Sequence, residues 1–114
     1  MSEESNEVKQ AVLELGLEDW IPLPEAVTAV EVRAALRGDR EAWPAVSEAL
    51  KDLLREHRVQ LFRGRWDEDD PRALSDAEAL EVLGEERWYT FHPEDPEDER
   101  IYFVNVKNVR RDAV

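Results

Sequence analysis

The fold is decided by residues 43–66, which read WPAVSEALKDLLREHRVQLFRGRW. Apolar side chains recur in the first part of this stretch at steps of three and four, the spacing of an amphipathic helix that buries one face. The residues on that predicted buried face are Trp43, Val46, Leu50, Leu53, Leu54 and His57. From Val59 the pattern changes to alternation, which is typical of a half-buried strand. This stretch therefore predicts a helix that leads into a strand with almost no loop.

Two more helices are predicted before residue 43. The first runs from about Ser5 to Leu15, and Gly16 is expected to end it with a left-handed cap. The second is expected to begin near Pro24, because proline suits the first turn of a helix, and to end at Gly38. The buried stripe of this second helix would consist of Leu23, Val27, Val30 and Ala34.

The second half of the chain alternates charged breakers with short predicted elements. Residues 67–71 are a charged breaker, and Ser75 with Glu78 forms a capping box that starts a helix ending at Gly84. Residues 87–91 have the composition of an extended segment, and residues 92–99 that of an exposed acidic loop. Residues 100–106 are the most strand-like of all, and residues 107–114 are expected to form a flexible tail.

The length and composition favour one domain over residues 1–114. A chain of 114 residues with 42% hydrophobic residues can bury a core without covalent staples. The absence of cysteine excludes disulfides and thiolate sites and is typical of a reducing compartment. The N-terminus lacks a signal-peptide pattern and no stretch is apolar enough for a membrane span, so we expect a cytoplasmic protein with no membrane contact.

The net charge of −13 is concentrated in one segment. Residues 67–99 contain 14 acids and 2 bases, a net charge of −12, which leaves −1 for the rest of the chain. Such a segment repels nucleic acid and attracts a basic protein. We therefore expect a basic protein as the partner and regard nucleic acid as disfavoured.

The order of the predicted elements resembles that of the winged helix-turn-helix superfamily. The resemblance rests on residues 21–66, with a Pro-Leu-Pro-Glu-Ala-Val helix start, a turn at Gly38-Asp39, a third helix and the strand Gln60-Leu61-Phe62-Arg63. The chain is also similar to a loosely defined group of small bacterial proteins with a Leu-Ser-x-x-Glu-Ala-Leu helix after such a strand. The resemblance implies an α+β, winged-helix-like fold with three N-terminal helices and a small antiparallel sheet. Residues 67–99 would be an acidic helical insert between the wing strands, where an ordinary wing has a short loop.

The same resemblance implies an alternative function, a DNA-binding transcriptional regulator. Its third helix and wing would contact DNA through Lys51, Arg55, Arg58, Arg63 and Arg65. Glu48, Asp52 and Glu56 offset the bases of that helix, however, and favour an ordinary solvated helix face.

No motif in the sequence indicates catalysis or a cofactor. The acidic runs lack the ligand spacing of a calcium loop, and His57 and His92 belong to no zinc pattern. The four serines stand in no nucleophile-like context, and the four glycines form no phosphate loop. We therefore expect no enzyme, no metal and no cofactor.

The function predicted from the sequence is a non-catalytic protein-binding module with an acidic surface. It would neutralise a basic partner in the manner of an immunity protein or antitoxin, with aromatic anchors ringed by charge. The predicted partner-binding residues are Trp66, Asp67, Glu68, Asp69, Asp70, Trp88 and Tyr89. A homodimer is compatible with this reading.

Overall fold

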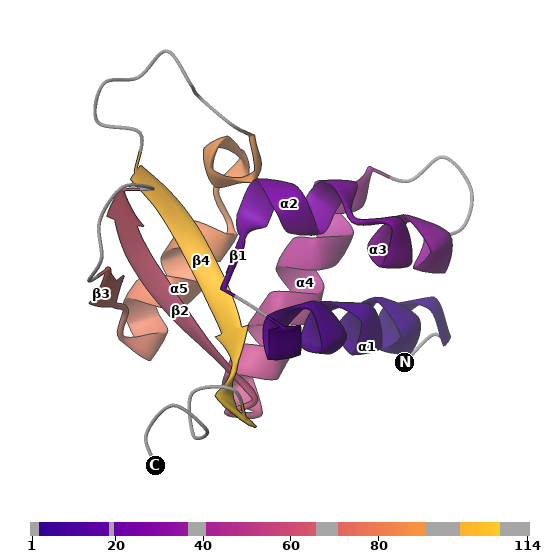
Figure 1. Cartoon of the computed structure of the whole chain (residues 1–114), viewed down its shortest axis with the longest axis horizontal. Helices are drawn as coiled ribbons and strands as arrows, with labels where there is room; N and C mark the ends of the chain where they lie inside the picture. The colour runs from indigo at the N-terminus through magenta and orange to yellow at the C-terminus, as the bar shows by residue number, and fades with distance from the viewer. Residues whose placement is uncertain (1–2, 19, 37–40, 66–70, 91–98, 108–114) are drawn as a thin grey trace.

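The computed structural model describes residues 3–18, 20–36, 41–65, 71–90 and 99–107, and shows helices packed on an antiparallel sheet (Figure 1). The predicted α+β class is confirmed. Among the described residues, four α-helices rather than three precede the long strand β2. The elements in chain order are α1 (Glu3–Glu18), β1 (Ile21–Pro22), α2 (Leu23–Thr28), α3 (Val30–Ala35), α4 (Ala42–Arg55), β2 (Val59–Arg65), β3 (Arg72–Ala73), α5 (Asp76–Leu83), the 3-10 helix η1 (Glu86–Tyr89) and β4 (Glu99–Asn105).

Helix α4 is the central element, as the apolar period of residues 43–54 predicts. It contacts α1, α2, α3, α5 and β2. Its buried side chains are Ala42, Ala45, Val46, Ser47, Ala49, Leu50, Leu53 and Leu54. Because so much of its surface is covered by neighbouring elements, α4 has only a narrow solvent face.

The sheet has the strand order β1-β4-β2-β3, so the last strand of the chain lies in the middle. Strands β2 and β4 pair along their whole length, from Val59 opposite Asn105 to Arg65 opposite Glu99. The inner face carries the core residues Leu61, Ile101 and Phe103, all fully buried. Helices α4 and α5 lie behind this face, whereas no described helix lies in front of the outer face (Figure 1).

The connection between α4 and β2 is short because α4 ends in a Schellman motif. The amide of Arg58 donates to the carbonyl of Leu53 at 2.9 Å, and that of His57 to the carbonyl of Leu54 at 3.0 Å. His57 has a φ of 59°, in the left-handed region that this motif requires. The placement of His57 on the buried helix face was therefore wrong, since its side chain lies beyond the helix and is exposed.

Gly16 does not end the first helix, contrary to the prediction. Helix α1 continues through it to Glu18. A Cβ at this position would stand 2.7 Å from the backbone nitrogen of Asn105, so glycine is needed for the close approach of α1 to β4. Asn105 fixes the same contact, because its buried Nδ2 donates to the carbonyl of Leu13 at 3.2 Å.

The single helix expected over residues 24–38 is two short helices, α2 and α3, and residues 37–40 lie outside the described part. Ala29 separates them with extended backbone (φ −60°, ψ 136°). The Thr28 hydroxyl donates to the carbonyls of Pro24 and Glu25, a local bond that competes with helix continuation. The break turns α3, so Val30 and Ala34 are exposed instead of buried, whereas Val32 and Ala35 face the core.

Residues 71–90 pack against the N-terminal half of α4, where Trp43 and Ser47 contact them. The capping box is confirmed, because the Ser75 hydroxyl accepts from the amide of Glu78 and the Glu78 carboxylate accepts from the amide of Ser75. The extended segment expected over residues 87–91 is wrong for its described part, since Glu86–Tyr89 form η1. The Tyr89 hydroxyl and the Ser47 hydroxyl both donate to the carbonyl of Leu83, at 2.7 and 2.5 Å, and join η1, α4 and α5.

Candidate partner-binding surface

Both acidic runs of the chain are attached to one end of the sheet. The run at residues 67–70 follows β2, whose last residue is Arg65, and the run at residues 94–98 precedes β4, whose first residue is Glu99. Arg65 and Glu99 are direct partners in the β2–β4 ladder. Segments 66–70 and 91–98 themselves lie outside the described residues, but these attachment points are fixed, and the two segments together contain eight acids and no lysine or arginine.

Helix α5 and η1 extend the negative charge within the described residues. Asp76, Glu81 and Glu86 are exposed there. Glu78 is part of the capping box. The hydrogen bond from the Ser75 amide is the largest cause that lowers its pKa, and the Ser75 hydroxyl and Arg72 lower it further. Helix α5 contains three acids and no base, so it continues the acidic insert as a folded element.

Of the predicted partner-binding residues, Trp66, Asp67, Glu68, Asp69 and Asp70 lie outside the described residues. Trp88 and Tyr89 are described, and they belong to the core, with 8% and 5% of their surfaces exposed. The ring of Tyr89 lies 5.4 Å from that of Trp43, and burial raises the pKa of its hydroxyl. In this structure both residues act in packing, so they do not supply the exposed aromatic anchors that the sequence suggested.

A cavity of about 130 Å³ lies over Trp88, between the β2–β3 pair and the α5–η1 segment. The guanidinium carbons of Arg63 and Arg87 lie 4.9 and 4.3 Å from the centre of the indole ring, within the range of cation–π attraction. Three arginines and three glutamates balance one another around the apolar floor. The lining residues are Arg63, Arg72, Leu74, Glu78, Glu81, Val82, Glu85, Arg87 and Trp88.

The charges of this cavity are largely used within the chain. Arg72 pairs with Glu78 at 3.2 Å, Arg87 with Glu85 at 3.4 Å, and Arg63 with Glu99. Each guanidinium therefore already has a carboxylate partner. The cavity has no surplus of either charge among its lining residues, and we assign it no ligand.

Three of the five bases predicted for DNA contact are paired with acids. Arg55 pairs with Asp52 at 3.4 Å, Arg58 pairs with Glu56 at 3.6 Å, and Arg63 is engaged as described above. The Nζ atom of Lys51 lies 3.6 Å from the position of a Cβ at Gly84, beside the C-terminal carbonyls of α5. The backbone of Arg65 is described, but its side chain is not.

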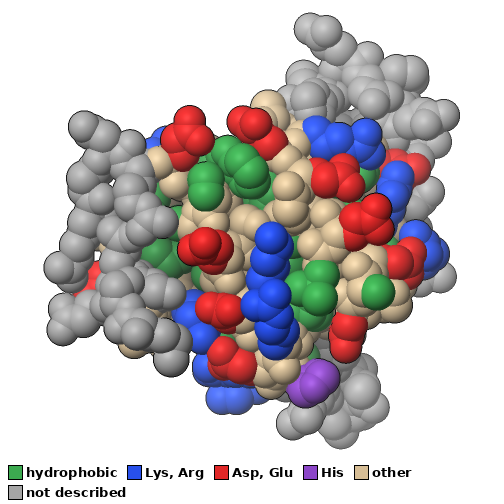
Figure 2. Space-filling model, turned by 180° about the vertical axis from the view of Figure 1, so that it is seen from behind, with side chains coloured by type: hydrophobic (Ala, Val, Ile, Leu, Met, Phe, Trp, Pro, Cys, Tyr) green, Lys and Arg blue, Asp and Glu red, His purple; other side chains and the backbone are tan. Residues whose placement is uncertain are grey.

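The arrangement of charges on the helical side agrees with this pairing. Seen from behind the sheet, a short column of Lys and Arg side chains is flanked by Asp and Glu, and the described residues form no continuous positive surface there (Figure 2). Lys9 and Glu56 tie α1 to the end of α4 at 2.6 Å, and this hydrogen bond lowers the pKa of Glu56.

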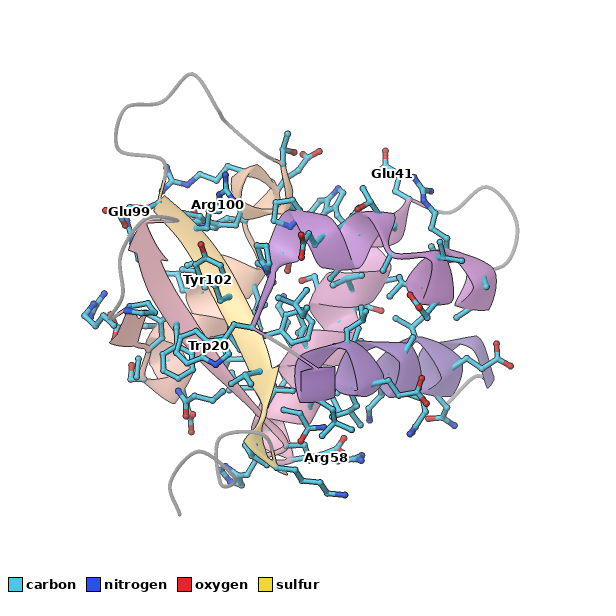
Figure 3. The ribbon with its side chains drawn as sticks, in the orientation of Figure 1. Trp20, Glu41, Arg58, Glu99, Arg100 and Tyr102 are labelled. Carbon is cyan, nitrogen blue, oxygen red and sulfur yellow. The ribbon has the colours of Figure 1, made fainter. Side chains whose placement is uncertain are left out.

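The outer face of the sheet carries an aromatic group that the sequence analysis missed. Trp20 stacks on Phe62 with ring centres 4.3 Å apart and an interplanar angle of 21°. Tyr102 is the ladder partner of Phe62, and Figure 3 shows Trp20 and Tyr102 over the front of the sheet. All three side chains are half-buried. The alternation of residues in β2 could have indicated that Phe62 points away from the core. The contact of Trp20 with Phe62 joins distant parts of the sequence and leaves no local pattern.

The described residues show no metal-binding cluster and no membrane-spanning helix. No group of three or more His, Cys, Asp or Glu side chains in that part of the chain is arranged to hold a metal ion. No helix within it combines the length and the apolar character that crossing a membrane requires. Comparisons of the chain with protein-family models, with curated proteins and with solved structures gave no match.

Proposed function

We propose that this protein is a non-catalytic protein-binding module whose acidic end engages a basic partner. The acidic end consists of residues 66–70 and 91–98, and the exposed acids of α5 and η1 add negative charge on the segment between them. The observation that carries the proposal is the pairing of Arg65 with Glu99, which attaches both acidic runs at the same end of the sheet. Segments 66–70 and 91–98, which adjoin this end, contain eight acids and no lysine or arginine.

The distribution of the bases supports the proposal. Arg63, Arg72 and Arg87, the arginines of the cavity next to this end, are paired with Glu99, Glu78 and Glu85. Each of these cations is therefore matched by an acid outside the two runs. A field of one sign speeds association with a basic protein and discriminates against acidic ones. Immunity proteins and antitoxins that neutralise basic, nucleic-acid-processing toxins need both properties.

We also propose that the fold is related to the winged-helix fold. It is supported by the passage from α4 into β2 and by the antiparallel pairing of β2 with β4. In that relationship β3, α5 and η1 would be the insert between the wing strands. A DNA-binding regulator remains the competing proposal and has less support, because α4 is covered on most sides and its Arg55 is paired with Asp52.

The proposal is tested by affinity capture from an extract of the native cells. The bait is the full chain, compared with a variant in which D67N, E68Q, D69N and D70N remove four charges. A matched control removes four exposed charges outside residues 66–99 through E14Q, E25Q, E31Q and E41Q. Each bait is used both with and without nuclease treatment of the extract.

We expect the wild type and the matched control to retain a basic protein that the first variant loses. Purified, that protein should bind with an affinity that falls as salt is added, because the attraction is screened. Retention of the same protein by the first variant would contradict the proposal. Recovery of DNA in samples without nuclease, undiminished by the four substitutions, would favour the DNA-binding alternative.

A further inference from the structure

We propose that the outer face of the sheet, centred on Trp20, Phe62 and Tyr102, is the apolar part of the surface that binds the basic partner. We call these three residues the aromatic face. The inference rests on the proposed function and replaces the anchors Trp88 and Tyr89, which lie in the core. The occupant is a segment of a basic protein that carries apolar side chains between its lysines or arginines.

The three rings form one continuous surface. Phe62 of β2 and Tyr102 of β4 are opposite each other in the ladder and therefore share a face. Trp20 immediately precedes β1, yet its ring stacks on Phe62 at 4.3 Å. Because β4 lies between β1 and β2, the indole has to cross the outer face of β4 to reach Phe62. Val104, which is on the same face of β4, is fully buried.

The position of the aromatic face supports a role in recognition. Its side chains are half-buried, so part of each ring surface still meets solvent. Half-buried tryptophan and tyrosine provide large, rigid contact area and are enriched among the residues that dominate protein–protein binding. The other printed ring contact joins Trp43 of α4 to Tyr89 of η1, and Tyr89 is buried in the core.

The aromatic face is continuous with the acidic end. Phe62 precedes Arg65 by three residues and Tyr102 follows Glu99 by three, a distance of about 10 Å along extended backbone. Arg100 lies between the aromatic face and the acidic end, on the same side of the sheet. Among the described residues it is the one lysine or arginine on that part of the outer face. Protein interfaces usually have an apolar centre and a polar rim. The acids therefore select the basic partner, and the rings contact its apolar side chains.

The test uses two synthetic peptides of equal length and charge, one alternating arginine with leucine and the other alternating arginine with serine. Their binding to the full chain is measured by fluorescence anisotropy at low salt. We expect the leucine peptide to bind at least about tenfold more tightly. F62S and Y102S should each remove most of that preference. The matched control V30S, at a residue that is 78% exposed on α3, should retain it.

Equal affinity of the wild type for both peptides would overturn this inference and leave the proposed function intact. Failure of both peptides to bind would overturn both proposals. Hydroxyl-radical labelling of the unmodified chain covers the case in which F62S or Y102S does not fold. Trp20 and Tyr102 should be labelled in the free protein and protected by the leucine peptide. Labelling that is absent in the free protein, or unchanged by the peptide, would show that the face serves the chain's own packing.

Discussion

His57 stands in a backbone conformation that suits glycine. Its φ of 59° belongs to the left-handed region, which costs an ordinary L-residue about 1–2 kcal/mol. We expect H57G to raise the free energy of unfolding by about 1 kcal/mol, since the imidazole is exposed and has no hydrogen bond or ion pair with another described residue. Urea denaturation measures the change. H57A, which keeps a Cβ, should give a clearly smaller gain, and equal effects of the two substitutions would contradict the strain argument.

Gly16 and Gly84 form a matched pair for testing close packing. A Cβ on Gly16 would meet the Asn105 backbone at 2.7 Å, whereas the contacts of a Cβ on Gly84 begin at 3.6 Å. We expect G16A to destabilise the fold by about 1–3 kcal/mol, because β4 has to move away from α1. G84A, at a right-handed φ of −86°, should be close to neutral. Thermal denaturation compares the two, and a tolerated G16A would mean that α1 and β4 can separate without loss.

At the scale of the element, α5 depends on its capping box. S75A removes the hydroxyl that accepts from the Glu78 amide, and we expect it to destabilise the fold by about 1 kcal/mol at neutral pH. It should also raise the pKa of Glu78, which Ser75 lowers in the wild type. A carboxyl group whose pKa is lowered by folding stabilises the folded chain at pH values above its ordinary pKa, and this stabilisation is lost as the pH falls. The difference in stability between S75A and the wild type should therefore shrink in acid. Urea denaturation at neutral and acidic pH, with NMR titration of Glu78, tests this.

The contact between η1 and α5 is expected to weaken in alkali. Burial raises the pKa of Tyr89 above its ordinary value, so the phenol stays neutral in the folded chain and ionises on unfolding. That contribution is complete below about pH 10 and is lost as the pH rises further. Y89F should cost about 1 kcal/mol at neutral pH through its lost hydrogen bond, and should flatten the alkaline decline. Denaturation from about pH 8 to about pH 11 measures both. An unchanged alkaline slope in Y89F would exclude Tyr89 as its cause.

At the scale of the whole molecule, the acidic end should reduce stability. The two acidic runs adjoin paired residues, Arg65 and Glu99, so we expect their like charges to repel each other. We expect neutralisation of residues 67–70 to raise the melting temperature at low salt more than the matched control at Glu14, Glu25, Glu31 and Glu41. Raising NaCl from about 0.01 M to about 0.5 M should remove most of the difference. Equal gains in both variants at low salt would show that only net charge matters.

Sequence patterns predicted the elements that depend on local signals. The apolar period and alternation of residues 43–65, the Ser75–Glu78 capping box and the β-rich run at residues 100–106 all correspond to elements of the structure. The break at Ala29 has no glycine or proline to mark it. It follows from the packing of α2 and α3 against different neighbours and from the backbone bonds of Thr28.

Of the candidate partner-binding surface, only the negative charge could be predicted from the sequence. The acidic composition of residues 67–99 is visible in the sequence, whereas the attachment of both runs to one sheet end depends on the pairing of β2 with β4. Trp88 looked like an exposed anchor because charges surround it in sequence. In space, Arg63 and Arg87 cover its ring instead. The stack of Trp20 on Phe62 joins residues 42 positions apart, which no local pattern reveals.

The strand order also determines when this chain can fold during synthesis. Strand β4 follows every other described element in the chain, yet it lies between β1 and β2 and packs against α1. Until the ribosome has made it, β1 lacks its ladder partner and β2 lacks its longest one, while α1 and α4 expose apolar faces that β4 and its neighbours later cover. Such long-range pairing folds slowly and leaves a nascent chain open to aggregation and chaperone binding. The helices can form early, but they have to wait for residues 99–105 before they can join a native sheet.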